Sequence, residues 1–301
     1  MRVLHFSDLH IGLGLHRVPF FDWPGKRLAG GLNLLRGRSR HFADAARKAL
    51  GLVDLDKRLA PDFVLCTGDL TALATHAEFE AARSLLEPLP DSPRFVVTPG
   101  NHDAYTRPTV REGRFRQYFE GGLRTDFPGL RTDGPWPVVR VPDDDVAIIA
   151  VDSARNNLLP WRASGRIPAA QIEGLRAALS DPRVAGRFVF LMTHYAPCRS
   201  DGSPDTREHG LRNVDAFLGA ASSIERGALL CGHVHEMFRV EIAAFRGEVF
   251  CAGSATYRGR EGVWLFDRDD RGVWTARRGR WTGEEYDVEA EGTPVAGQEP
   301  R

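Results

Sequence analysis

Residues that could bind a metal ion occur in pairs and short runs along this sequence. An Asp-x-His pair stands at Asp8 and His10, and a His-x-His pair stands at His233 and His235. In an extended segment the side chains at positions i and i+2 point the same way, so each pair can contact one ion. The other candidates for such chemistry are Asp69, Asn101, His102, Asp103 and His194.

Each of these groups directly follows a short apolar run that predicts a buried strand. The runs cover residues 2–7, 62–67, 94–98, 187–193 and 228–231. The carboxyl ends of neighbouring strands converge at one edge of an α/β sheet, where such proteins place their sites. Burying so many polar groups with nothing to neutralise them would be costly. Each motif alone is a weak signal, but together they predict a metal site at that edge.

The remaining pattern predicts a mixed α/β fold in one domain over residues 1–281. Amphipathic spacing predicts helices over 42–59, 76–87, 167–179 and 213–221. A Pro-Asp-Asp-Asp turn between apolar runs at 138–141 and 146–151 is typical of a hairpin. The last third predicts antiparallel strands over 238–243, 248–252, 262–267 and 272–276. We therefore expect two sheets packed face to face, with helices on their outer faces.

The composition excludes several classes of protein. Lys and Arg number 40 and so do Asp and Glu, so the chain lacks the excess positive charge of nucleic-acid-binding proteins, and nucleic acid is not an expected partner. No apolar run approaches the roughly 18–20 residues of a membrane-spanning helix. The first residues do not form a signal peptide, and the four cysteines are isolated, which favours free buried thiols. We therefore expect a cytoplasmic protein.

The motifs resemble, in their order and strand context, those of the calcineurin-like metallophosphoesterases. The resemblance rests on Asp8-x-His10, Gly68-Asp69, Gly100-Asn101-His102-Asp103, His194 and Gly232-His233-x-His235. It implies an α/β fold, a four-layer α/β/β/α sandwich with two central mixed β-sheets, that holds two divalent metal ions. Asp8, His10, Asp69 and His235 would bind one ion. Asp69, as a bridging ligand, would bind the other with Asn101, His194 and His233.

The expected reaction is the hydrolysis of a phosphodiester or a pyrophosphate. Imidazole and carboxylate ligands suit Mn, Fe, Zn or Ni. Two such ions would activate a bridging hydroxide as the nucleophile and stabilise charge on the phosphoryl oxygens. The resemblance places His102 near the leaving-group oxygen, where it would donate a proton or stabilise the transition state. Asp103 would orient this loop or the imidazole.

Several branches of the family remain open. Val151-Asp152-Ser153, followed by Gly165-Arg166-Ile167 and Gln171, is similar to the bacterial cyclic-nucleotide phosphodiesterases. Protein Ser/Thr phosphatases carry Gly-Asp-x-Val-Asp-Arg-Gly, which residues 68–74 do not match. Asp8-Leu9-His10-Ile11-Gly12 is shared with Mre11-like nucleases, but the neutral charge disfavours a nuclease. A non-catalytic binding scaffold is the least favoured reading, because every predicted ligand is present.

Residues 13–40 form a long connection after the first strand. They hold six Lys and Arg against one Asp, together with Phe20, Phe21 and Trp23. This segment is expected to be a cap over the site or a substrate-access element in contact with a lipid surface. In the second case the chain would be similar to the UDP-2,3-diacylglucosamine pyrophosphate hydrolases, act on a lipid, and lie peripherally at the inner face of a membrane. The substrate-access candidates are Arg17, Lys26, Arg27 and Arg36.

The last twenty residues predict a disordered tail. Residues 282–301 hold six acidic residues and one arginine, and their few apolar residues follow no regular period.

Overall fold

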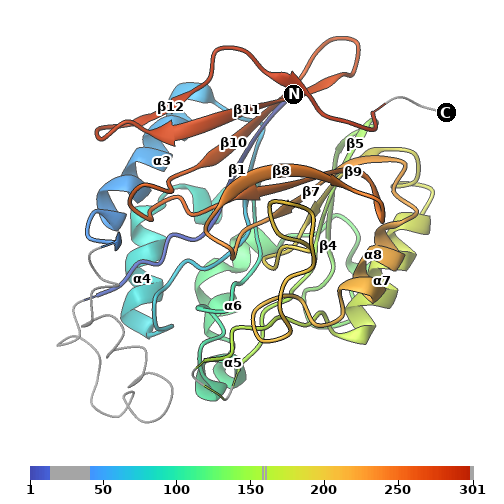
Figure 1. Ribbon diagram of the computed structural model, residues 1–301. Helices are drawn as coiled ribbons and strands as arrows, with labels where there is room; N and C mark the ends of the chain where they lie inside the picture. Colours follow the sequence, from blue (N-terminus) through green and yellow to red (C-terminus); the bar gives the residue numbers. More distant parts are fainter. Residues whose placement is uncertain (14–40, 158, 160, 299–301) are drawn as a thin grey trace.

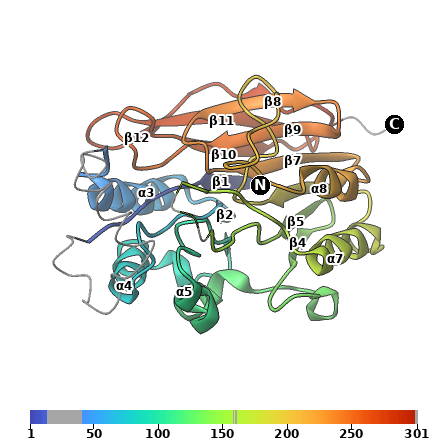
Figure 2. The same ribbon diagram turned by 60° about the horizontal axis from the view of Figure 1, so that its bottom comes forward.

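The computed structural model describes residues 1–13, 41–157, 159 and 161–298. Two mixed β-sheets lie between two groups of helices (Figures 1 and 2). This arrangement confirms the expected four-layer α/β/β/α fold class. No helix in these residue ranges is long and apolar enough to cross a membrane.

The first sheet has seven strands, in the order β12-β11-β10-β1-β2-β3 with β13 beside β11. Its parallel part consists of β1 (Arg2–Phe6), β2 (Phe63–Cys66) and β3 (Phe95–Val97). The antiparallel part consists of β10 (Val263–Arg268), β11 (Trp274–Trp281), β12 (Tyr286–Val288) and β13 (Thr293–Pro294).

The second sheet has six strands, in the order β4-β5-β6-β7-β9-β8. The predicted hairpin is present as β4 (Val138–Asp143) and β5 (Val146–Ala150). Parallel pairing then joins β5, β6 (Phe188–Met192), β7 (Arg226–Cys231) and β9 (Phe245–Ala252), and β8 (Met237–Ile242) closes the sheet antiparallel to β9.

The helices cover the outer faces of the two sheets (Figure 1). On the side of the first sheet lie α3 (Ala45–Leu59), α4 (His76–Leu85), α5 (Arg107–Glu112) and α6 (Arg114–Phe119). On the side of the second sheet lie α7 (Ala169–Ser180) and α8 (Val214–Ala221). Short 3-10 turns cover Leu89–Asp91, Glu120–Leu123 and Pro128–Leu130.

The core lies in the layer between the sheets and in the layers beneath the helices. Along β5, Val146, Ile148 and Ala150 join the layer between the sheets, while Ala147 and Ile149 pack beneath α7 and α8. Because both faces of this strand are buried, its sequence is continuously apolar rather than alternating. This explains why the central strands could be recognised from the sequence.

The prediction of a disordered tail over 282–301 is wrong as far as residue 298. β12 and β13 extend the first sheet, and both Tyr286 and Val295 are buried. The Tyr286 ring packs against Trp281, and Arg58 on α3 donates hydrogen bonds to Glu285 and to the carbonyl of Tyr286. The two buried apolar residues of this segment, Tyr286 and Val295, are too few to form a periodic pattern. The acidic composition around them therefore favoured the prediction of disorder.

The expectation of a purely antiparallel last third is also wrong. β9 pairs in parallel with β7, and β10 crosses to the other sheet beside β1. Apolar patterning indicates that a strand is buried, but it does not indicate its partner. The two six-residue helices α5 and α6 were not predicted, because helices of that length contain too few residues to show a period.

Candidate metal centre

The predicted ligands lie where five strands end at a common edge. β1, β2 and β3 lead to Asp8, Asp69 and Asn101, while β6 and β7 of the other sheet lead to His194 and His233. Backbone hydrogen bonds join the loops: the amide of Asp8 donates to Gly68 O (2.8 Å), and that of Gly232 donates to His194 O (3.0 Å). The sheets therefore position the side chains through short, mutually bonded loops.

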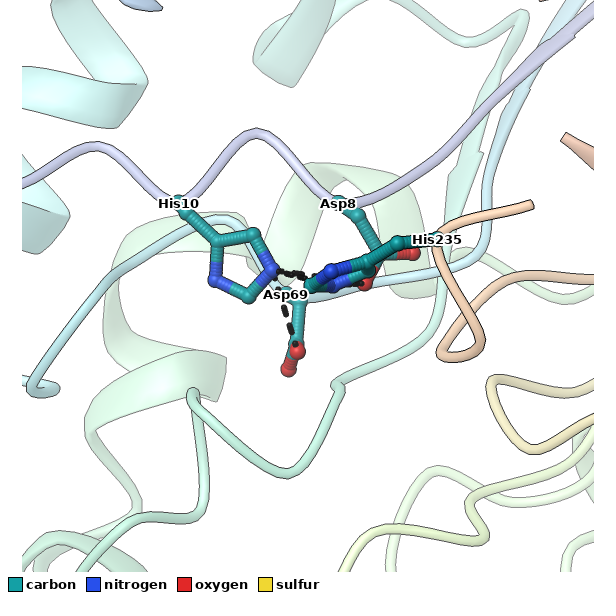
Figure 3. A group of neighbouring side chains, drawn as sticks. All are labelled: Asp8, His10, Asp69 and His235. Atoms are coloured by element: carbon teal, nitrogen blue, oxygen red, sulfur yellow. Dashed lines mark hydrogen bonds and ion pairs between the residues drawn. The ribbon is translucent and has the colours of Figure 1, made fainter. Parts of the chain in front are cut away.

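The first predicted ligand set converges closely (Figure 3). Asp8, His10, Asp69 and His235 each offer one ligand atom, and these atoms lie within 4.8 Å of one another. His10 Nε2 lies 2.8 Å from His235 Nε2, and His235 Nε2 lies 3.0 Å from Asp8 Oδ1. Ligands that share an ion at about 2.0–2.2 Å stand about 3–3.5 Å apart. These spacings therefore fit a single ion.

The second predicted set converges on the amide oxygen of Asn101. Its Oδ1 lies 2.8 Å from His233 Nδ1 and 3.2 Å from His194 Nε2. His194 Nε2 also lies 3.6 Å from Asp69 Oδ2. This set draws its residues from both sheets, so a bound ion would connect them.

Asp69 stands between the two sets. Its Oδ2 lies 3.6 Å from His10 Nε2 and 3.6 Å from His194 Nε2. Its other oxygen, Oδ1, accepts a hydrogen bond of 2.7 Å from the amide of His102. One carboxylate oxygen therefore faces a nitrogen of each set, a position from which it could bind an ion in either set.

Backbone carbonyls determine which ring nitrogens face the centre. Thr67 O lies 2.6 Å from His194 Nδ1, and His209 O lies 3.0 Å from His233 Nε2. A carbonyl only accepts, so each of these nitrogens carries the proton and leaves a lone pair on the opposite nitrogen. His194 Nε2 and His233 Nδ1 then present lone pairs to the oxygen of Asn101. An array of lone pairs of this kind fits a cation.

The charge states of the buried groups suit metal ligation. Burial lowers the pKa of His194, and it lowers the pKa of His233 well below its usual range, so both imidazoles are neutral. Burial alone would raise the pKa of Asp8, but hydrogen bonds from His10 and His235 hold it well below its usual range. Neutral imidazoles and an ionised carboxylate are the protonation states that bind a divalent ion.

The backbone is strained at most of these ligands. Non-glycine residues with positive φ are Asp8 (57°), His10 (46°), Ala60 (45°), Asp69 (54°), Ala74 (56°), His233 (70°) and His235 (52°) in the described part of the chain. Five of these seven are predicted ligands. Such conformations cost on the order of 1–3 kcal/mol each and cluster at functional sites. These backbone conformations therefore lower the stability of the fold while they direct the side chains toward one centre.

Two motif glycines leave space that the ligands occupy. A Cβ at Gly232 would overlap Ser7 Oγ and Asp8 Oδ2, and a Cβ at Gly100 would overlap Asp69 Oδ1. Only glycine lets the backbone approach the two carboxylates this closely. This close approach explains the Gly-Asn-His-Asp and Gly-His-x-His patterns.

His102 lies beside both ligand sets. Its ring packs edge-on against His10, with centroids 4.7 Å apart, and Ala72 O lies 2.6 Å from its Nδ1. The proton on Nδ1 therefore points to Ala72, which leaves Nε2 as the atom that can exchange a proton with a substrate.

Asp103 orients the loop and not the imidazole. It accepts hydrogen bonds from the amides of Leu70 (3.1 Å), Thr71 (3.0 Å) and Gly100 (3.0 Å). Burial raises its pKa to about 6, although these bonds oppose the shift. Of the two roles expected from the sequence, the structure places Asp103 in the first.

Some groups that support the ligands carry no signal in the sequence. His209 is partly exposed, yet its ring lies 4.1 Å from that of His233, and its carbonyl accepts a hydrogen bond from His233 Nε2. The carbonyls of Thr67, Ala72 and His209 carry no sequence signal, because every residue has one. Arg17, Lys26, Arg27 and Arg36 lie outside the described residues.

Comparisons with known proteins find the same fold among solved structures. Among solved structures, a dimetal phosphatase from Danio rerio has a TM-score of 0.62 at 15% identity, over 95% of this chain and 98% of that one. A purple acid phosphatase from yellow lupin (Lupinus luteus) seeds has a TM-score of 0.55 at 12% identity, over 95% of this chain and 52% of that one. No curated protein matches the sequence.

The family follows from a match over most of the chain. The family model described as calcineurin-like phosphoesterase matches residues 1–237, which contain every predicted metal ligand and His102. The solved structures share the fold. The chain therefore belongs to the calcineurin-like phosphoesterase family and is a metal-dependent phosphoric ester hydrolase.

Proposed function

We propose that the protein is a dinuclear phosphodiesterase or pyrophosphohydrolase. The observation that carries this proposal is the position of Asp69, whose Oδ2 faces a histidine nitrogen of each ligand set. Asp8, His10, Asp69 and His235 would hold one divalent ion. Asp69, Asn101, His194 and His233 would hold the other. The nitrogen and oxygen donors suit Mn, Fe, Zn or Ni.

The chain's own residues divide the remaining work. When bound, a pair of divalent ions supplies a nucleophile at neutral pH and neutralises charge on the phosphoryl group. In its imidazolium form His102 would donate the Nε2 proton to the leaving-group oxygen, while Ala72 O accepts from Nδ1 and fixes the orientation of the ring. Asp103 holds the loop of His102 against that of Asp69.

The loop after Asp69 favours a diester or a pyrophosphate over a monoester. Leu70, Thr71, Ala72, Leu73 and Ala74 are buried, and none of them carries a charge. A monoester dianion has an extra negative charge that would benefit from a cation there, as in the Asp-Arg pattern that this loop lacks. A diester carries one negative charge at the phosphoryl group and needs less compensation.

The bridging role of Asp69 can be tested by metal content. In Asp69→Asn, both ion occupancies should fall, because the amide oxygen is uncharged and a weaker ligand for two cations. Elemental analysis of metal-reconstituted protein should give about two ions per wild-type chain and fewer than one in the variant. Asp144→Asn, in the exposed β4–β5 turn, is the matched control. Retention of one ion at full affinity in Asp69→Asn would contradict a bridge.

The reaction class can be tested with two chromogenic esters. With added Mn²⁺, bis(4-nitrophenyl) phosphate should be hydrolysed with a higher kcat/KM than 4-nitrophenyl phosphate. A kcat/KM at least about tenfold in favour of the monoester would overturn the diesterase assignment. Absence of both activities in protein that binds two ions would favour the non-catalytic scaffold.

A further inference from the structure

Four arginines gather near the second ligand set and the loop of His102. Arg155, Arg162 and Arg166 lie on the connection between β5 and α7, and Arg212 lies just before α8. No guanidinium of this arginine cluster forms an ion pair or hydrogen bond with any residue that the structure describes. By contrast, Arg199 pairs with Asp205 nearby.

The two connections that carry the arginine cluster are bonded together. The amide of Arg166 donates to Ser153 O (3.0 Å), and that of Arg212 donates to Gly165 O (3.0 Å). The amide of Gly165 donates to Gly210 O (3.1 Å). Burial and then the positive charges of Arg212, Arg166 and Arg162 lower the pKa of Arg155. Like charges are therefore held near one another on a fixed backbone.

One aromatic ring separates these connections from the second ligand set. Tyr195 lies with its ring 4.1 Å from that of His233, and its hydroxyl donates to Ala163 O (2.5 Å). Gly165 packs directly on the same ring, because a Cβ there would overlap it. The arginine-bearing backbone therefore lies against a residue that contacts a predicted ligand.

Arg155 also reaches the loop of His102. With Asp103 and Ala104 it lines a cavity of about 280 Å³. The neighbouring Asn156 side chain donates to Tyr105 O (3.5 Å), and the Tyr105 ring stacks on His102. The carboxyls in this cavity are bonded elsewhere: Asp103 to backbone amides, Asp152 to the amide of Ala154, and Asp133 to the Gln171 side chain.

We propose that the arginine cluster binds a second phosphate group of the substrate, one that is not cleaved. This inference deepens the proposed function and rests on it. Guanidinium groups bind phosphate through paired N–H donors, and an anion relieves the repulsion among the four cations. The phosphoryl group of a simple diester, held at the metals, leaves these cations unused. The substrate is therefore a molecule with at least two phosphates, such as a pyrophosphate or a nucleotide with a further phosphate.

Binding can be measured without the metals. Chelator-treated, dialysed protein is titrated with inorganic pyrophosphate in a calorimeter at low salt. Wild type should bind, added salt should weaken binding, and Arg166→Gln/Arg212→Gln should raise Kd at least about tenfold. Arg155→Lys should bind more weakly than wild type but more tightly than Arg155→Gln, since lysine keeps the charge without the paired donors. Arg271→Gln, in the β10–β11 turn, is the control and should keep the wild-type Kd.

Failure to bind pyrophosphate in wild type, or equal affinity in all variants, overturns the inference. An unchanged thermal unfolding temperature in a variant would show that its weaker binding does not come from misfolding. Arg162, Arg166 and Arg212 are exposed, so their substitution should change stability little.

A kinetic arm separates this inference from the proposed function. The substrates are the 4-nitrophenyl 5′-esters of thymidine 5′-phosphate and of thymidine 3′,5′-bisphosphate, which share a leaving group and differ by one phosphate. The ratio of their kcat/KM values should favour the bisphosphate in wild type and fall at least about tenfold in Arg166→Gln/Arg212→Gln, through KM. A ratio unchanged by substitution counts against the inference. If neither ester is hydrolysed but metal-free protein binds pyrophosphate through the arginines, the proposed function fails and the anion site stands.

Discussion

Each buried histidine of the second ligand set, and His102, has one ring nitrogen bonded to a backbone carbonyl. Thr67 O and His209 O direct the lone pairs of His194 and His233 toward Asn101. Ala72 O accepts from Nδ1 of His102 and leaves Nε2 on the opposite side of that ring. In the proposed function the same arrangement would serve metal ligation in two rings and proton transfer in the third. His102 is also tied to Asp69 through its backbone, because its amide donates to Asp69 Oδ1.

This distinction gives a prediction for His102→Ala. The variant should lose kcat by on the order of 10²–10⁴-fold, because the leaving group no longer receives a proton. Metal content, measured by elemental analysis, should stay near that of wild type, because the hydrogen bond from the backbone amide of residue 102 to Asp69 does not depend on the imidazole. A loss of metal in His102→Ala would place the ring among the ligands. His76→Ala, at the exposed start of α4, is the control.

At the residue scale the sequence predicts the side chains that could bind a metal ion, but not the backbone carbonyls that orient them. Asp8, His10, Asp69 and His235 could be identified because their side-chain types carry the chemistry and strand ends bring them together. The supporting carbonyls could not, because a carbonyl is common to every residue. The contact between His209 and His233 could not be predicted for a related reason: it depends on the path of a loop, which has no periodic pattern in the sequence.

At the scale of elements, the sequence predicts the buried central strands but not β12 and β13. The central strands are buried on both faces, so their sequences are continuously apolar; they are β1, β2, β5, β6 and β7. β12 instead depends on one side chain, Tyr286, whose hydroxyl bonds Ala255 O. An acidic segment can thus belong to the fold through a single anchor, which composition does not reveal.

The importance of this anchor can be measured. Tyr286→Ala should lower the free energy of unfolding by about 3–5 kcal/mol, as expected when a large buried aromatic side chain is removed. Urea denaturation of the metal-free protein provides the value. Asp287→Ala, on the neighbouring exposed position of β12, should change stability by less than about 0.5 kcal/mol. Equal, small effects of both variants would show that the segment contributes nothing to the fold.

The connection between β1 and α3 gives a prediction about access. It begins at residue 13, three residues after His10, and its basic residues would meet a phosphorylated substrate arriving at the metals. We propose that it controls this access. Replacing residues 20–37 with a short Gly/Ser bridge should spare hydrolysis of bis(4-nitrophenyl) phosphate and impair a larger substrate, chiefly through KM.

A lipid role for this connection has its own readout. If the substrate is a lipid, wild type but not the deletion should co-sediment with anionic vesicles, and added salt should weaken that binding. Equal activity of both forms on every substrate, without vesicle binding by either, would reduce the connection to a surface loop.

At the scale of the whole molecule, the site is the place where the two sheets meet. Asp8, Asp69 and Asn101 come from the first sheet, and His194, His233 and His235 come from the second. The sequence predicts two sheets and the edge at which the site lies, because the carboxyl ends of parallel strands lie at the same edge of a sheet. It does not predict that β10 belongs with β1, since the pairing of distant strands is decided by packing across the whole core.

Asp152, a half-buried carboxyl outside the metal centre, makes the stability of the molecule depend on pH. Burial raises the pKa of Asp152 to about 7, and the charges of Asp133 and Asp103 add to the shift. In the unfolded chain an aspartate titrates near pH ~3.9. Between these values the native state holds a proton that the unfolded state has lost, so stability falls as pH rises, by about 1.4 kcal/mol per pH unit.

Asp152→Asn tests this linkage, because the amide keeps an acceptor for the Ala154 amide and cannot ionise. Relative to wild type, the variant should gain about 2–3 kcal/mol of unfolding free energy between pH 5 and pH 8, since wild type alone must ionise a buried group over that range. Urea denaturation of both metal-free proteins at the two pH values measures the difference. Asp144→Asn, which changes an exposed carboxyl, should follow wild type at both. A constant offset between Asp152→Asn and wild type would mean that Asp152 is already ionised in the native state at pH 5, which would contradict the raised pKa and remove this carboxyl from the pH dependence of stability.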